Sequence, residues 1–161
     1  MFLGLCLIFI GIVIYFQVPK ISLISSTSQI TPIPQMSFAK VIRVIDGDTI
    51  QLEGGDRVRY IGMNTPELET NECFATEASE INKNLVLGKI IKLEKDISDT
   101  DKYGRLLRYV YVDNVFIDDY LVKNGDAKVM TIPPDTKYKD EFLQSQNYAK
   151  QNNLGLWGKC N

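Results

Sequence analysis

The chain has 161 residues, a formal net charge of -2 and no histidine. Without histidine there can be no Ser-His-Asp triad, Cys-His dyad or HExxH zinc site, so any hydrolytic chemistry must use carboxylates, arginines, hydroxyls or a metal held by oxygen atoms. The acidic balance, with a pI of about 5.2, also argues against a broad basic surface for binding nucleic acid.

The first 37 residues differ in composition from the rest of the chain. Residues 1–19 carry no charged side chain and are almost continuously apolar, which predicts a hydrophobic helix nearly long enough to span a bilayer. We expect an uncleaved membrane anchor, with a cleaved signal segment and a buried core helix as the alternatives. Residues 20–37 are rich in Ser, Thr and Pro and predict an extended linker. Residues 38–161 then form one domain of ordinary size.

Within this domain the patterns predict short strands with helices between them. Period-2 alternation and turn residues predict strands over 39–52, 57–62 and 89–94 and a hairpin over 105–117. Three- and four-residue spacing and terminal signals predict helices over 75–87, 118–124 and about 138–152. This order of elements predicts an α+β fold in which helices pack against a small closed β-barrel.

Three short segments carry residue types suited to phosphate chemistry. Asp46 and Asp48 flank a glycine and could supply oxygen ligands to Ca²⁺, although such a sequence is also ordinary turn chemistry. Arg59 could bind a phosphate, and Glu67, eight residues later, could deprotonate a water. A charged turn before Arg105 could aim a second guanidinium inward. Considered singly, each segment also has a purely structural interpretation.

Taken together, the sequences DGDT, R-x(5)-TPE and TDKYGR, in this order, resemble the staphylococcal nuclease family. The resemblance extends roughly from Ala39 to the C-terminus. It implies a five-stranded OB-fold β-barrel with three packed α-helices. It also implies a Ca²⁺-dependent site that cleaves DNA and RNA with little sequence preference and leaves 3′-phosphates.

The resemblance also implies a role for each matching residue. The expected metal ligands are the Asp48 carboxylate, the Thr65 main-chain carbonyl and Asn64. The residues expected to hold the scissile phosphate and activate the water are Arg59, Arg105 and Glu67. The residues expected around the metal pocket and the nucleotide are Asp46, Lys102 and Tyr103.

Two positions depart from the family pattern. Asn64 stands where the family's best-known member has an aspartate, so we expect weaker Ca²⁺ binding because one negative charge is missing. Thr131, Ile132 and Pro133 stand where that member has aromatic residues that stack on a base, a role that Tyr138 or Tyr103 could fill instead.

The cysteines of the domain bear on its location. We expect Cys73 and Cys160 to form a disulfide, with two free thiols as the alternative, and a disulfide would suit an oxidising compartment. Together with the apolar segment this predicts that the domain is anchored outside the cytoplasmic membrane or secreted. We also expect a monomer, since the sequence gives no sign of an obligate oligomer. The alternative function is a non-catalytic OB-fold module that binds nucleic acid or protein. Such a module would not need Asp48, Arg59, Glu67 and Arg105 together.

Overall fold

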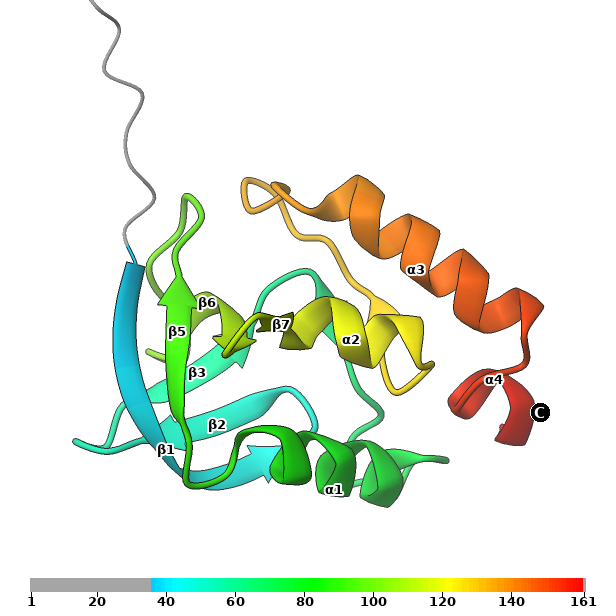
Figure 1. Ribbon diagram of the computed structural model, residues 1–161, viewed down its shortest axis with the longest axis horizontal. Coiled ribbons are helices and arrows are strands. Elements are labelled where there is room, and N and C mark those ends of the chain that lie inside the picture. Colours follow the sequence, from blue (N-terminus) through cyan, green and yellow to red (C-terminus); the bar gives the residue numbers. More distant parts are fainter. Residues whose placement is uncertain (1–35, 161) are drawn as a thin grey trace, which may run out of the picture. The chain divides into compact units, whose positions relative to one another are not determined.

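Five strands close into a barrel in the computed structural model, which describes residues 36–160 (Figure 1). These strands are β1 (Met36–Asp46), β2 (Thr49–Leu52), β3 (Arg57–Tyr60), β5 (Ile90–Glu94) and β6 (Leu106–Val112). They pair antiparallel in the order β3-β2-β1-β5-β6, and a parallel pairing of β3 with β6 closes the ring. The predicted five-stranded OB-fold barrel is therefore confirmed.

Helices cover this barrel, as the predicted α+β class requires. They are α1 (Ala75–Val86), α2 (Ile117–Lys123), α3 (Lys139–Gln151) and the short α4 (Leu156–Lys159). The shortest strands are β7 (Val115–Phe116), which extends β6 as a hairpin, and β4 (Met63–Asn64), which pairs with β8 (Lys128–Val129). The sequence patterns did not predict β4, β8 or α4, because two to four residues are too few to show a period.

The barrel interior is filled by side chains that alternate along the strands. Ile50, Val58 and Ile91 are completely buried there, and burial of each such side chain contributes about 1.5–3 kcal/mol. Asp48 shares the strand parity of Ile50 and is likewise buried. The alternation that builds the core therefore also turns one carboxylate of the candidate site inward.

The boundaries of β1 differ slightly from the prediction. The strand begins at Met36, which pairs with Glu94, two residues before the predicted start of the domain. The predicted hydrophobic helix over residues 1–19 and most of the predicted linker lie outside the described residues. Within residues 36–160, no helix is both long and apolar enough to cross a membrane.

A disulfide joins two parts of the domain that are far apart in sequence. Cys73 lies just before α1 and Cys160 just after α4, with Cα atoms 5.8 Å apart and a sequence separation of 87. The side chains of Phe74 and Leu156 pack in the same apolar cluster as Cys160. The C-terminal end of the domain is thus held against the loop that leads into α1.

Candidate functional site

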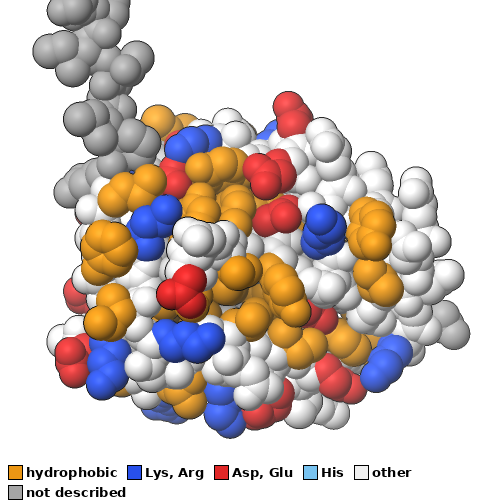
Figure 2. Space-filling model, viewed as in Figure 1, with side chains coloured by type: hydrophobic (Ala, Val, Ile, Leu, Met, Phe, Trp, Pro, Cys, Tyr) orange, Lys and Arg blue, Asp and Glu red, His pale blue; other side chains and the backbone are white. Residues whose placement is uncertain are grey.

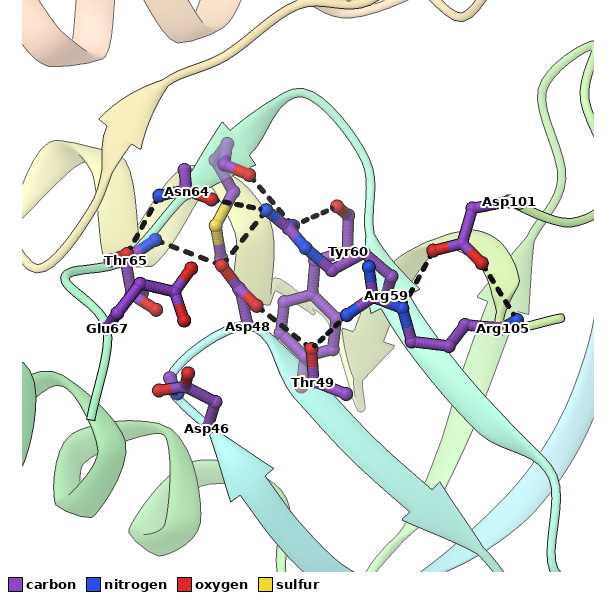
Figure 3. Close-up of polar contacts among 12 residues, drawn as sticks. Asp46, Asp48, Thr49, Arg59, Tyr60, Asn64, Thr65, Glu67, Asp101 and Arg105 are labelled. Atoms are coloured by element: carbon purple, nitrogen blue, oxygen red, sulfur yellow. Dashed lines mark hydrogen bonds and ion pairs between the residues drawn. The ribbon is translucent and has the colours of Figure 1, made fainter. Parts of the chain in front are cut away.

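A buried ion pair connects the start of β2 with β3. The Oδ2 atom of Asp48 lies 3.1 Å from Nη2 of Arg59, and both residues are less than 10% exposed (Figure 3). Thr49 lies opposite Arg59 in the β2–β3 ladder, which places the preceding Asp48 beside the guanidinium. Asp48 also accepts hydrogen bonds from Thr65 N and Thr49 Oγ1, both at 3.0 Å. These contacts compensate for the loss of hydration that a buried charge suffers.

The guanidinium of Arg59 is directed into the protein. Nη1 donates to the carbonyl oxygens of Tyr60 and Met63 at 2.6 and 2.9 Å. Nη2 donates to Oδ1 of Asn64 at 2.7 Å in addition to its contact with Asp48. The four terminal N–H groups are thus all engaged, and only Nε–H remains. Arg59 therefore fixes the loop after β3 and contributes its positive charge to the site.

Asn64 bridges two of the residues expected at the metal. Its Oδ1 faces Arg59, and its Nδ2 donates to the Thr65 carbonyl oxygen at 2.9 Å. An aspartate could not make the second contact, because a carboxylate has no N–H. The pairing of Asn64 with Lys128 between β4 and β8 holds this loop in place. The oxygen atoms expected to bind Ca²⁺ at positions 64 and 65 are therefore already hydrogen-bonded within the protein.

Three carboxyl groups lie on the same side of Arg59: those of Asp46, Asp48 and Glu67 (Figure 3). Burial raises the pKa of Asp46, and the nearby charge of Asp48 raises it further. Partial desolvation and then the charge of Asp46 likewise raise the pKa of Glu67. A cation bound among these groups would relieve their mutual repulsion.

The oxygen donors here fit a hard cation such as Ca²⁺. Within residues 36–160, however, no group of three acidic or cysteine side chains is arranged to hold a metal ion. The oxygens of Asn64 and Thr65 would have to complete the set of ligands, each through the lone pair that its present hydrogen bond leaves free.

Arg105 reaches the same site from the turn before β6. Its Nε donates to Oδ2 of Asp101 at 2.7 Å, and its Nη1 lies 3.3 Å from Thr49 Oγ1. The other oxygen of Asp101 accepts hydrogen bonds from the backbone N–H groups of Tyr103 and Arg105, at 2.9 and 3.0 Å. Within residues 36–160, the Nη2 group of Arg105 has no acceptor. Unlike Arg59, Arg105 therefore has free donors for a ligand.

A pocket of about 260 Å³ opens beside the two arginines. Its apolar wall consists of Ile61, Met63, Leu107, Met130, Ile132 and Pro133. Lys102 and Tyr103 do not line this pocket, although their neighbours Asp101 and Arg105 do. Tyr103 is 63% exposed, and the Lys102 ammonium lies 4.9 Å from the centre of the Tyr103 ring. Tyr138 does not line it either, because its ring packs against Tyr109 and its hydroxyl contacts Glu94. The pocket wall is thus largely aliphatic.

Three residues that organise the site were not among those expected from the sequence. Asp101 and Thr49 position Arg105. Both residues belong to the motifs quoted above, Asp101 to TDKYGR and Thr49 to DGDT, so the sequence could have indicated their roles. Asp135 accepts hydrogen bonds from Ile97 N and Ser98 N at 3.0 and 2.8 Å, which fixes the loop opposite the aliphatic wall. We find no sequence signal for this third role.

Comparisons with known proteins agree with this geometry. A family described as "Staphylococcal nuclease homologue" matches residues 57–159. Endonuclease YncB of Bacillus subtilis (strain 168) is 44% identical over 126 residues, which cover 73% of this chain and 60% of that protein. The SPbeta prophage-derived endonuclease YokF of the same organism is 42% identical, with 73% of this chain and 43% of that protein covered. This chain thus matches less than two thirds of the length of either Bacillus protein.

A thermonuclease from Staphylococcus intermedius is 38% identical over 124 residues, which cover 73% of this chain and 74% of that protein. A thermonuclease from Staphylococcus hyicus is 34% identical with the same coverage. The family match over residues 57–159 contains Arg59, Glu67 and the turn that carries Arg105. With its barrel, its motifs and its relatives in agreement, this chain belongs to the staphylococcal nuclease family.

Proposed function

We propose that the domain is an endonuclease that hydrolyses phosphodiester bonds of DNA and RNA with little sequence preference. The observation that carries this proposal is the convergence of Arg59 and Arg105 on Asp48 and Thr49, with the Glu67 carboxyl nearby (Figure 3). A phosphate at this place would meet two positive charges and a carboxylate able to accept a proton. Phosphate contacts carry no base identity, hence the weak sequence preference. The endonuclease and thermonuclease names of the relatives support the same reaction.

We further propose Ca²⁺ as the cofactor, held by the Asp48 carboxylate, Asn64 and the Thr65 carbonyl, with Asp46 shaping the pocket. The clustered oxygen donors and the raised pKa values of Asp46 and Glu67 support a cation here. When bound, a divalent cation would neutralise charge on the phosphate oxygens.

The chain's own residues account for the remaining steps of the proposed reaction. Glu67 accepts a proton from a water molecule, whose oxygen attacks phosphorus as the bond to the 5′-oxygen breaks. The leaving oxygen takes a proton from solvent, so the products are a 3′-phosphate and a 5′-hydroxyl. Arg105 donates from its free Nη2 group as negative charge develops on the phosphate. Arg59 adds its charge and holds Asp48 in place.

Two variants of neighbouring glutamates test this proposal. Glu67→Gln should lower cleavage of single-stranded DNA by about 10²–10⁴-fold, because the general base is lost. Glu69→Gln removes the same charge from an exposed position in the same loop and should leave the rate unchanged. Full activity in the presence of chelator would contradict the role of Ca²⁺. Binding of DNA without cleavage at any metal concentration would instead support the non-catalytic OB-fold module.

We also propose that residues 1–19 anchor the domain outside the cytoplasmic membrane or direct its secretion. The uncharged apolar sequence and the pairing of Cys73 with Cys160 support this, since disulfides persist in oxidising compartments. Mass spectrometry of the non-reduced protein after alkylation tests the pairing. Modification of both cysteines would remove this support for an exterior location.

A further inference from the structure

The outer face of β1 and β5 carries large apolar side chains that the barrel does not bury. Along β1, Ala39 and Val41 pack toward the core, so Met36 and Phe38 point outward and are 43% and 70% exposed. On β5, Ile91 is buried and its neighbour Ile90 is 69% exposed. Exposed apolar side chains that gather on one face of a soluble domain mark a surface for interaction.

Lysines lie among these apolar side chains. In the β1–β5 ladder Phe38 is opposite Lys92, and Lys40 is opposite Ile90. We call Met36, Phe38, Lys40, Ile90 and Lys92 the β1–β5 face. Figure 2 shows hydrophobic side chains lying among Lys and Arg side chains on the side of the domain that β1 and β5 form.

The lysines of the β1–β5 face stay outside the ion pairs of the described domain. Among the ion pairs of residues 36–160, none includes Lys40 or Lys92. The ammonium of Lys92 instead lies 4.2 Å from the ring centre of Tyr111. The acid at the end of this ladder, Glu94, is buried and paired with Lys137. The face is therefore apolar and cationic, a combination that suits the headgroup region of an anionic bilayer.

In sequence, the first strand of this face follows the proposed anchor after a short segment. Met36 begins β1, and residues 20–35 separate it from the apolar residues 1–19. Sixteen residues span at most about 55 Å when fully extended and considerably less when flexible. A domain tethered in this way meets the bilayer at a high effective concentration, so a weakly binding face can dock.

The candidate active site lies at the other end of the same strand. Nine residues of β1 separate Met36 from Asp46, and Figure 1 shows the strand running from its first residue to an end beside α1. A membrane in contact with the start of β1 would therefore leave its other end, which carries Asp46, uncovered.

We propose that the β1–β5 face docks on the surface of an anionic lipid bilayer, with the N-terminal segment as the tether. The inference rests on the proposed membrane location and is independent of the proposed nuclease activity. Phe38 and Ile90 enter the interface, and Lys40 and Lys92 face the lipid phosphates.

The test uses the full chain in vesicles of phosphatidylcholine and phosphatidylglycerol. In a Trp157→Phe background, which has no other tryptophan, Phe38→Trp reports on the face. Tyr148→Trp is the matched control, because Tyr148 is 49% exposed on α3, away from β1 (Figure 1). Lipids with a quencher near the headgroup should quench the indole at position 38 several-fold more than the one at position 148. This difference should shrink when Lys40→Gln and Lys92→Gln are added, or in vesicles of phosphatidylcholine alone.

Flotation of the vesicles separates the failure modes. Equal quenching at the two positions in protein that floats with the vesicles would overturn the docking and leave the anchor intact. Protection of position 38 from aqueous iodide without quenching by lipid would show that the linker or a second copy of the chain covers the face, which also overturns the proposal. Protein that does not float would overturn both the anchor and the docking. DNA cleavage by the same samples measures the nuclease separately.

Discussion

Lysine in place of Arg59 should destabilise the fold, whereas the same substitution at Arg105 should not. A lysine at position 59 can keep an ion pair with Asp48, but one ammonium cannot also reach the carbonyls of Tyr60 and Met63 and the Asn64 amide. Each hydrogen bond to a charged donor contributes about 1.5–3 kcal/mol, and the losses are not additive. We therefore expect a loss of about 3–5 kcal/mol, because three hydrogen bonds are lost and their contributions overlap.

Arg105 provides the matched comparison, because its side chain is partly exposed and its ion pair is with Asp101 near the surface. Its replacement by lysine should change stability by less than about 1 kcal/mol. Urea unfolding followed by fluorescence of Trp157, the single tryptophan, measures both values. Both variants should lose DNA cleavage, Arg105→Lys because the free guanidinium donors are lost, and Arg59→Lys because Asp48 and the loop after β3 lose their support. Equal unfolding midpoints for the two variants would refute the assignment of Arg59 as the residue that holds the loop after β3.

Three further outcomes follow from the structure. Asn64→Asp should tighten Ca²⁺ binding on the order of tenfold, because a carboxylate joins the ligands; equal or weaker binding in calorimetric titration would contradict this. Replacing Cys73 and Cys160 with serine releases a loop of 87 residues and should lower stability by about 2–5 kcal/mol. Scanning calorimetry should then show a Tm lower by about 8–19 °C, whereas an unchanged Tm would indicate free thiols. Burial raises the pKa of Asp126 to about 6, so the folded state holds this proton more tightly than the unfolded state. Stability should therefore fall as pH rises from about 4 to 6, by up to about 3 kcal/mol, and urea midpoints of Asp126→Asn should lack this decrease.

The strands and long helices could be predicted because their periodicity is local. The burial of Asp48 followed from its parity with Ile50 and needed no knowledge of the partner strand. The contacts of Arg59 could not be predicted in the same way, because they depend on the loop after β3. That loop is held by the pairing of β4 with β8, in which Asn64 lies opposite Lys128, 64 residues later in the chain. The aliphatic wall that includes Ile132 is likewise assembled from distant segments.

The Asn64 position shows a second kind of limit. The sequence predicted a weaker metal site there from charge alone, and that remains a prediction. The structure adds that the amide faces Arg59 with one end and the Thr65 carbonyl with the other. The sequence shows which functional groups are present at a site. It does not show which of them already make hydrogen bonds within the protein.

The parallel pairing of β3 with β6 has a consequence for when activity can arise. This seam joins Arg59 to Leu107 and so brings together two arginines that lie 46 residues apart in the chain. Long-range pairings of this kind form only after a large loop has closed, which slows folding. A chain that is still extended therefore has the residues of the proposed nuclease but no assembled site. Closure of the barrel would act as the step that switches cleavage on.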